Sequence, residues 1–217
     1  MRATLAATFL PTEATLRLCR LGVTIPVAVA LMLAGATLIG QAVWRDARAV
    51  LAQILLERAF AASLASGHTV KPWPWADTWP VARIEVPRLH HGVIVLAGSS
   101  GQALAFGPGH VERTPDAGDP GTAVYAAHRD THFAFLGDVR IGDAIRVTRR
   151  DGRVFTFRVT GTSIVRWDAS GIDADADGRA LALATCWPLD AKLSGPLRYV
   201  VRAELADDLA ADRTAHR

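Results

Sequence analysis

Three residues whose side chains are suited to covalent catalysis stand at the ends of predicted strands. Cys186 ends the apolar run LALATC, Arg198 begins the run LRYVVRAEL twelve positions later, and His128 ends the run TAVYAAH. Residues at strand ends are held by the sheet and are still open to a cleft. They offer a thiol nucleophile, an acid/base and a fixed cation for a developing negative charge. We therefore predict nucleophilic catalysis by a cysteine, with a loop between antiparallel neighbours bringing Arg198 beside the thiol.

The thiol of Cys186 stands alone in the part of the chain that we expect to be exported. The sequence contains two cysteines, Cys19 and Cys186, and a predicted membrane span separates them, so they cannot pair within one chain. A leftover thiol is unusual in an oxidising compartment. The alternative to a reactive group is a buried cysteine packed as a small apolar side chain. Two cysteines also exclude a disulfide-dense scaffold and an all-cysteine zinc site.

An uncharged apolar stretch, residues 21–43, predicts one transmembrane helix. Its 23 residues would extend about 35 Å, enough for a hydrocarbon core of roughly 30 Å. A cleaved signal peptide would have a shorter apolar region followed by an A-x-A-like site. Arg17 and Arg20 precede the stretch, which favours a cytoplasmic N-terminus (residues 1–20) by the positive-inside rule. We therefore expect the bulk of the chain to be exported across the membrane.

Residues 44–79 are predicted to connect the span to the exported domain. Residues 44–67 are rich in Ala, Leu, Arg and Gln, which favours a helical stalk. The segment KPWPWADTWP (71–80) then brings three prolines and three tryptophans together, and the prolines end the helix. The tryptophans suit either a membrane interface or packing against the domain. At the other end, the acidic and alanine-rich residues 206–217 are expected to form a flexible tail.

Residues 80–205 are predicted to form an all-β domain. Short apolar runs separated by turn signals, without long helical patterns between them, are typical of a small β-barrel or sandwich. Asp151-Gly152 lies between two runs and is a hairpin signal. The predicted strands are residues 81–86, 92–98, 122–127, 144–150, 154–165, 181–185 and 197–205.

The distribution of charge argues against a nucleic-acid partner. Residues 1–45 hold four arginines and one glutamate, whereas the other 172 residues carry 20 basic and 20 acidic side chains. The formal net charge of +3 is thus an N-terminal property, and the predicted exported domain has no basic footprint. Half of the residues are apolar and 21% are charged, which excludes disordered and low-complexity classes.

Six motifs in the predicted exported domain occur in a recognisable order. They are ARIEVPRL (82–89), GPGH (107–110), AAHRDTHFAFL (126–136), GDAIRV (142–147), LATCWP (183–188) and PLRYVVRA (196–203). Over roughly residues 80–205 this order resembles the sortase family. The HRDTHF form and the TCWPLD…GPLRYVVRA ending look most like the sortases of Gram-negative bacteria, class GN. Two positions depart from common patterns: Ala127 stands where many sortases have Gly, and Trp187 where Tyr is frequent.

The resemblance implies an eight-stranded β-barrel with short helices that acts as a cysteine transpeptidase. His128, Cys186 and Arg198 would be its catalytic residues, and Thr185 is a candidate supporting residue whose alternative is packing. The thiol would attack a Leu-Pro-X-Thr-Gly-like sorting signal at the C-terminus of a secreted protein and form a thioacyl-enzyme. An amine acceptor would then receive the acyl group. Such an enzyme belongs to the cysteine peptidases among the hydrolases and requires no cofactor.

The loop before the cysteine strand carries part of a calcium motif. Asp173, Asp175, Asp177 and Gly178 match the start of an EF-hand loop, but Ala184 stands where the bidentate Glu is required. Some sortases bind calcium near this loop, so a calcium site is one interpretation and a solvated acidic loop is the preferred one. No other metal site is predicted.

Other functions compete with transpeptidation. A non-catalytic, membrane-tethered barrel could bind a peptide by edge addition, but Cys186, His128 and Arg198 would then coincide by chance. An L,D-transpeptidase shares Cys/His chemistry but carries an Arg two residues after the cysteine, where this chain has Pro188. Water could also resolve the thioester, which would make the enzyme a peptidase. His110 and His132 are interpreted as structural or surface residues.

Overall fold

The computed structural model describes residues 13–191, 193 and 195–206. Most of the predicted N-terminal segment 1–20 and of the predicted tail 206–217 therefore lies outside the described residues. The chain divides into two compact units, residues 1–50 and 51–217. Helix α1 (Glu13–Ser66) contributes residues to both units.

One helix in the described part of the chain is long and apolar enough to cross a membrane. The candidate span falls within Ala28–Ser66, and none of its most apolar window is buried in the protein. A membrane anchor and a signal sequence share these properties of length and composition.

The second unit is built from eight described strands and a few short helical turns. The helical turns are α2 (Gly101–Leu104) and the 3₁₀ turns η1 (Pro87–Leu89) and η2 (Ala134–Asp138). The strands are β1 (Pro80–Val86), β2 (His91–Ala97), β3 (Gly109–His110), β4 (Gly121–Ala126), β5 (Ala144–Arg149), β6 (Val154–Arg166), β7 (Arg179–Cys186) and β8 (Leu197–Leu205).

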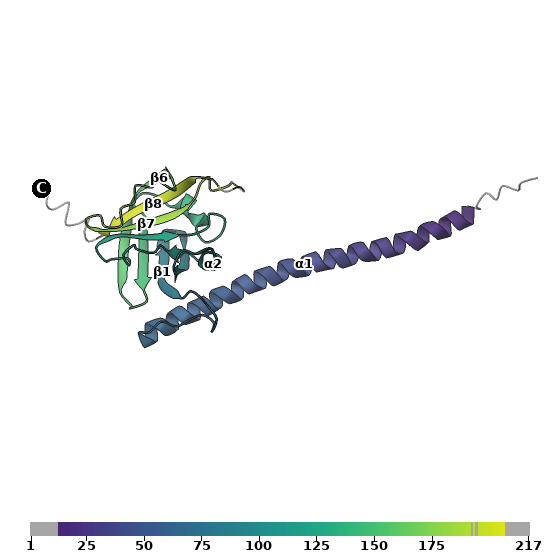
Figure 1. Cartoon of the computed structure of the whole chain (residues 1–217), viewed down its shortest axis with the longest axis horizontal. Helices are drawn as coiled ribbons and strands as arrows, with labels where there is room; N and C mark the ends of the chain where they lie inside the picture. The colour runs from purple at the N-terminus through teal and green to yellow at the C-terminus, as the bar shows by residue number, and fades with distance from the viewer. Residues whose placement is uncertain (1–12, 192, 194, 207–217) are drawn as a thin grey trace, which may run out of the picture. The chain divides into compact units, whose positions relative to one another are not determined.

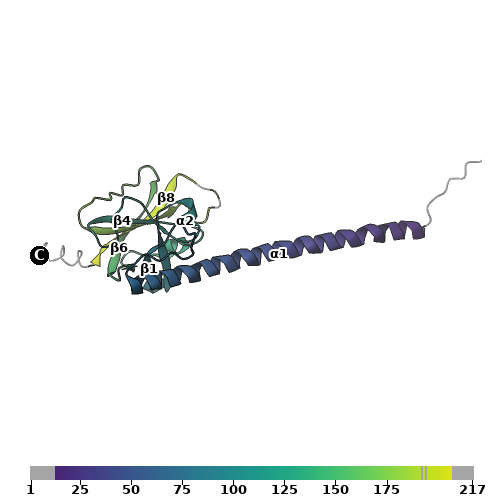
Figure 2. The ribbon, with the colours of Figure 1, turned by 60° about the horizontal axis from the view of Figure 1, so that its bottom comes forward.

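The strands close into a barrel in the order β1-β2-β3-β4-β7-β8-β6-β5. Figure 1 shows β8 between β6 and β7, and Figure 2 gives the same barrel turned by 60°. The β2–β3 and β4–β7 pairs are parallel. The predicted all-β, eight-stranded barrel is confirmed. The predicted hairpin at Asp151-Gly152 is also present, since β5 and β6 pair as antiparallel neighbours and Gly152 takes φ +82° between them.

The strand that the apolar pattern did not reveal is β3. It consists of Gly109 and His110 alone, and two residues are too few to produce a periodicity. A Cβ atom at Gly109 would lie 2.2 Å from the carbonyl oxygen of Gly98 and 3.0 Å from the Cα atom of Ser99. The neighbouring backbone thus approaches this position so closely that only glycine fits it without a shift.

Alternating side chains fill the barrel and leave a second, smaller apolar face outside it. Tyr125, Leu181 and Leu183 point into the main core, together with Phe133 and Phe157. Residues at the intervening positions of β4, β7 and β8 form a separate buried cluster on the outer face, with Val124, Ala182 and Val200 at its centre. Successive side chains of a strand point to opposite faces. Every second residue of a strand can therefore meet its neighbours outside the barrel, and the residues between them cannot.

The part of α1 that belongs to the second unit covers β2. Leu56 and Phe60 pack against Ile94 and Leu96. Polar contacts surround this apolar cluster: the Gln53 amide donates to the carbonyl oxygen of Phe106 at 2.7 Å, and Arg83 pairs with Glu57 at 2.5 Å. Figure 2 shows this end of α1 beside β1.

An ion pair fixes the entry to β5. Arg88 donates from Nε and Nη2 to the two carboxylate oxygens of the buried Asp143, at 2.6 and 2.7 Å, and the backbone N–H of Arg140 donates to it at 2.8 Å. The hydrogen bond from Arg88 is the main cause that lowers the pKa of Asp143 below its usual value.

We predict that Asp143→Asn lowers the free energy of unfolding at neutral pH and that the loss depends on pH. Because the folded-state pKa is depressed, the carboxylate stabilises the fold above its unfolded pKa of about 4, and this contribution disappears as the pH falls through the folded pKa. Denaturation of the full-length protein in a mild detergent at several pH values measures the effect. Arg88→Met should reproduce the pattern. A difference from wild type that is as large at pH 3 as at pH 7 would contradict the prediction.

Candidate active site

Three neighbouring strands present the predicted catalytic residues on one face. The order β4-β7-β8 places β7 in the middle, with Ala126 opposite Ala184 across the parallel β4–β7 pair. His128 lies two residues beyond Ala126 and Cys186 two residues beyond Ala184, so both fall on the outer face by alternation. The backbone N–H of Ala127 donates to the carbonyl oxygen of Ala184 at 3.2 Å, which extends the pairing past the end of β4.

Cys186 and Arg198 are direct cross-strand partners in the antiparallel β7–β8 pair. The backbone N–H of Trp187 donates to the carbonyl oxygen of Leu197 at 3.0 Å, so Trp187 and Leu197 form a hydrogen-bonded pair. The adjacent pair, Cys186 and Arg198, is then a non-hydrogen-bonded pair, in which the side chains stand closest. The structure thus places Arg198 directly opposite Cys186, through the loop between antiparallel neighbours that we expected.

The backbone orients the side chain of Arg198. Nη1 donates to the carbonyl oxygens of Gly195 and Leu197, both at 2.9 Å. Among the described residues no hydrogen bond engages Nε or Nη2. Both contacts are to neutral carbonyls, so the positive charge of Arg198 is not neutralised by them. Arg198 and Cys186 are each half-buried, whereas His128 is exposed.

One cavity of about 510 Å³ collects these groups. Its walls come from β4, β7, β8 and the loops that surround their ends. The lining residues are Ser99, Leu104, Val111, Ala126, Ala127, His128, Trp167, Ser170, Ile172, Ala184, Thr185, Cys186, Arg198 and Val200. A thiol, an imidazole and a guanidinium therefore share one apolar-walled space on the outside of the barrel.

Thr185 ties the end of β4 to β7. Its side chain is buried, and its hydroxyl donates to the carbonyl oxygen of Ala127 at 2.8 Å. Ala127 precedes His128, so the hydroxyl holds the backbone from which the imidazole projects. The hydroxyl of Thr185 is thus engaged and its side chain is also buried, and a supporting role in the reaction stays a prediction.

His132 lies close to His128 but is itself half-buried. Burial lowers the pKa of His132 below its usual value, the neighbouring His128 lowers it further, and a hydrogen bond with the backbone of Ala105 opposes both effects. His110 is engaged elsewhere, with Nε2 in contact with Thr114 Oγ1 and the carbonyl oxygen of Pro115, both at 3.1 Å. Neither residue lines the cavity that contains Cys186.

Sequence reasoning missed the wall that the β6–β7 connection contributes. Trp167 is 64% exposed and lines the cavity with Ser170 and Ile172. The signal available in the sequence was a tryptophan two residues after the predicted strand 154–165. Further along this connection the backbone N–H of Asp175 donates to Asp173 Oδ1 at 3.0 Å, and both residues are exposed. In the described part of the chain no three His, Cys, Asp or Glu side chains gather as a metal site would require.

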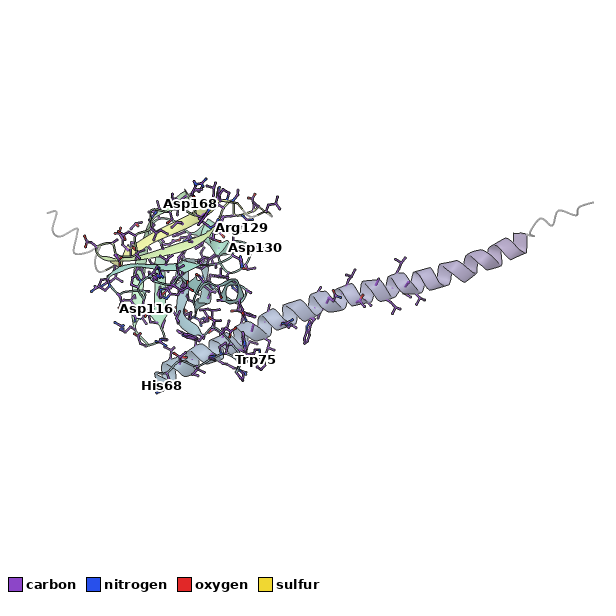
Figure 3. All side chains as sticks on the ribbon, in the orientation of Figure 1. His68, Trp75, Asp116, Arg129, Asp130 and Asp168 are labelled. Carbon is purple, nitrogen blue, oxygen red and sulfur yellow. The ribbon has the colours of Figure 1, made fainter. Side chains whose placement is uncertain are left out.

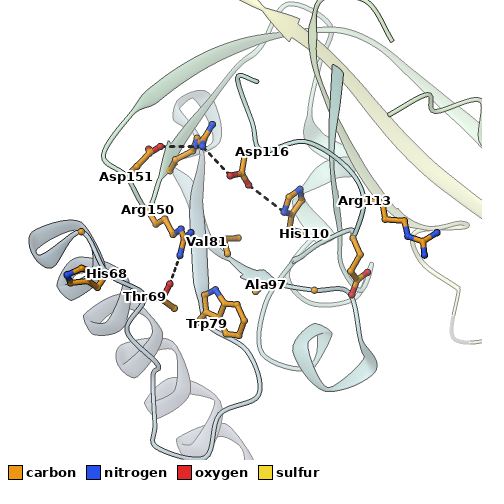
Figure 4. Close-up of a pocket in the computed structure, with 14 residues that line it drawn as sticks. His68, Thr69, Trp79, Val81, Ala97, His110, Arg113, Asp116, Arg150 and Asp151 are labelled. Carbon is orange, nitrogen blue, oxygen red and sulfur yellow. Dashed lines mark hydrogen bonds and ion pairs between the residues drawn. The ribbon is translucent and has the colours of Figure 1, made fainter. Parts of the chain in front are cut away.

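A second, larger cavity of about 770 Å³ lies away from these residues. Figure 4 shows its polar wall, where Asp116 contacts both Arg149 and His110. Arg149 is buried and pairs with Asp119 at 2.8 Å, Asp116 at 3.1 Å and Asp151 at 3.3 Å. Arg150 donates to Thr69 at the same wall. No cysteine lines this cavity, and its buried cation, Arg149, is paired with carboxylates. The larger of the two cavities is therefore not the one suited to cysteine catalysis.

Comparison with known proteins bears on the family and the fold of the chain. The family profile described as the sortase domain matches residues 84–206. Sortase D of Bacillus subtilis (strain 168) is 29% identical over 119 residues, which cover 54% of this chain and 60% of the relative. The match thus spans less than two thirds of that relative's length.

Solved structures share the fold at low sequence identity. The sortase D5 transpeptidase of Clostridium perfringens aligns with a TM-score of 0.57 and 21% identity over 72% of this chain and 98% of its own. Sortase A from Corynebacterium diphtheriae aligns with a TM-score of 0.55 and 24% identity over 61% of this chain and 63% of its own. The family profile covers more than half of the sequence and the barrel has the matching fold, so this chain belongs to the sortase family.

Proposed function

We propose that this protein is a membrane-anchored cysteine transpeptidase. It cleaves a C-terminal Leu-Pro-X-Thr-Gly-like sorting signal of a secreted protein and transfers the acyl group to an amine acceptor. The observation that carries the proposal is the single cavity that contains Cys186, His128 and Arg198. Membership of the sortase family supports the reaction type.

The first half of the reaction is acylation of the thiol. The Cys186 thiolate attacks the carbonyl carbon of the scissile peptide bond and forms a C–S bond. The N–H groups of Arg198 that the backbone does not engage stabilise the oxyanion of the tetrahedral intermediate. His128, as imidazolium, protonates the leaving nitrogen as the C–N bond breaks. A thioester of Cys186 and a free amine are the products of this half.

The second half returns the enzyme to its starting state. The acceptor amine attacks the thioester carbonyl, neutral His128 takes the proton from the attacking nitrogen, and the C–S bond breaks to release the Cys186 thiolate. Arg198 stabilises the second oxyanion as it did the first. All proton transfers use one side chain, so the proposed chemistry needs no metal ion or other cofactor.

The apolar walls of the cavity suit a peptide substrate. Val111, Ala126, Ile172, Ala184 and Val200 surround the three polar residues, and small side chains on β4 and β7 leave room beside the sheet. Peptide-binding clefts combine such apolar walls with a few polar groups that fix orientation. An extended sorting signal lying across the ends of β4, β7 and β8 would expose its carbonyl to Cys186.

The location follows from the apolar N-terminal helix. We propose that α1 anchors the protein in the inner membrane in a single pass, with the N-terminus cytoplasmic and the barrel on the periplasmic side. The uncharged stretch 21–43 and the preceding Arg17 and Arg20 support this orientation. The HRDTHF and TCWPLD forms support assignment to the Gram-negative class of sortases. A secreted protein and an amine acceptor are the partners, and the balanced charge of residues 46–217 supports no nucleic-acid partner.

We predict that Cys186→Ala abolishes the thioacyl-enzyme. Full-length protein is mixed with a peptide containing a Leu-Pro-X-Thr-Gly sequence, and mass spectrometry of the digested protein locates the acyl group. Wild type should carry it on the fragment with Cys186, and Cys19→Ala should behave like wild type. An adduct that persists in Cys186→Ala would overturn the assignment of the nucleophile. Release of the free acid instead of an amide, with excess amine present, would identify a hydrolase.

We predict that Arg198→Lys lowers kcat with little change in KM. Lysine keeps the charge but loses the planar fork, and loss of one oxyanion donor typically lowers kcat about 100- to 1,000-fold. The matched control is Arg158→Lys, which should leave kcat unchanged. Arg158 lies on the neighbouring strand β6, donates to the carbonyl oxygen of Gly142 at 2.7 Å and does not line the cavity that contains Cys186. Steady-state kinetics that give a raised KM and an unchanged kcat would instead assign Arg198 to peptide binding.

We predict that Thr185→Val destabilises the fold by about 1–3 kcal/mol, because the buried hydrogen bond to the carbonyl oxygen of Ala127 is lost at constant side-chain volume. Thr185→Ser keeps the hydroxyl and removes only a methyl group. It should therefore lose less stability and less kcat than Thr185→Val. Chemical denaturation and kinetics at one temperature provide both values. If the valine variant were as stable and as active as wild type, Thr185 would be a packing residue only.

A further inference from the structure

A buried arginine follows His128 directly. Arg129 is 8% exposed, whereas His128 and Asp130 on either side of it are exposed. Figure 3 labels Arg129 well away from Asp116, which belongs to the larger cavity. Arg129 does not line the cavity that contains Cys186, so it has no place in the reaction as described so far.

Within the described part of the chain, the guanidinium of Arg129 makes a single hydrogen bond. Nη2 donates to the carbonyl oxygen of Leu193 at 2.6 Å. Nη1 is buried and has no hydrogen-bond partner among the described residues. Burying a charged group with an unpaired donor is unfavourable, and an apolar side chain of similar size would often be as stable or more stable in such a place. The described contacts of Arg129 therefore supply little to offset the cost of burying its charge.

The connection between β7 and β8 receives hydrogen bonds from two arginines. Arg129 reaches the carbonyl oxygen of Leu193, and Arg198 reaches that of Gly195 in the same connection and that of Leu197, the first residue of β8. The side chain of Leu193 is 84% exposed, so packing does not hold this part of the connection. One arginine belongs to the turn that carries His128, and the other is the proposed oxyanion donor. The same short stretch of backbone thus links the two sides of the cavity.

We propose that Arg129 is a positioning residue that clamps the β7–β8 connection to the His128 turn. The clamp fixes the spacing between the imidazole of His128 and the guanidinium of Arg198. This inference rests on the proposed transpeptidase function, because the spacing matters only if both groups act on one bound peptide. Arg129 itself touches neither the substrate nor the thiol.

The substitution Arg129→Met tests the clamp, since it keeps the length of the side chain and removes every donor. Misplacement of catalytic groups by about 1 Å lowers rates roughly 100-fold, so we expect kcat for the Leu-Pro-X-Thr-Gly peptide to fall about 10- to 100-fold. KM should change less than about threefold, and the melting temperature should remain near that of wild type. Arg129→Lys should be intermediate, because one ammonium can reach the carbonyl of Leu193 without the fork.

The matched control is Arg149→Met in the same full-length protein. Arg149 is 9% exposed, which is nearly the burial of Arg129, but it pairs with carboxylates at the other cavity. We expect Arg149→Met to lower the melting temperature and to leave kcat unchanged well below it. Where the methionine variant fails to fold, Arg149→Lys replaces it and is compared with Arg129→Lys.

Amide hydrogen exchange provides a readout that needs no peptide. Arg129→Met should speed exchange in the β7–β8 connection and in the turn after His128, without affecting the β5–β6 hairpin. Unchanged exchange, or a kcat within twofold of wild type, would overturn the inference. So would a loss of kcat that merely follows the melting temperature, as in the control. If wild type forms no thioester, the proposed function fails, and with it the catalytic spacing, while exchange still decides whether Arg129 holds the connection.

Discussion

The register of β7 is the constraint on which the site depends. This strand pairs in parallel with β4 and antiparallel with β8, and both partners must agree on one alignment. Because side chains alternate between faces, a slip of one residue would turn Cys186 into the barrel and Thr185 out of it. The apolar side chains of Leu181 and Leu183 oppose such a slip, since they are buried in the main core. Packing inside the barrel thereby determines which residues meet outside it.

Much of this arrangement could be predicted from the sequence, because long apolar runs and strand ends leave a strong signal. The runs before Cys186 and after Arg198 led to the pairing of these two residues, and the hairpin at Asp151-Gly152 followed from its turn chemistry. The eight-strand count came from the family resemblance, because β3 is too short to have a periodicity. The hydroxyl contact of Thr185 and the burial of Arg129 could not be predicted. Both depend on which backbone carbonyl lies nearby in space, and an arginine beside a histidine in a turn is ordinarily solvated.

Three arginines of the barrel differ in what compensates their charge. Arg149 is surrounded by the carboxylates of Asp116, Asp119 and Asp151, so its contribution to the field outside this cluster is small. Among the described residues, the hydrogen bonds of Arg129 and Arg198 go to backbone carbonyls, which orient a guanidinium without neutralising it. Of these three arginines, Arg198 lines the cavity of Cys186 and Arg129 follows His128, which lines it too. A site in which negative charge develops on sulfur and then on oxygen benefits from nearby positive charge.

The lack of a side chain at Gly109 affects the strands on either side of β3. The carbonyl oxygen of Gly98 occupies the space that a Cβ atom would need. The distance between β3 and the backbone that follows β2 is therefore set by direct contact between backbone atoms. Gly109 also pairs with Ala126, two residues before His128. A single methyl group here would have to displace the backbone of Gly98 and Ser99, just after β2, or shift β3 and with it the pairing to Ala126. The close backbone contact at Gly109 thus influences the position of β4, which leads to His128, although Gly109 contributes no atom to the chemistry.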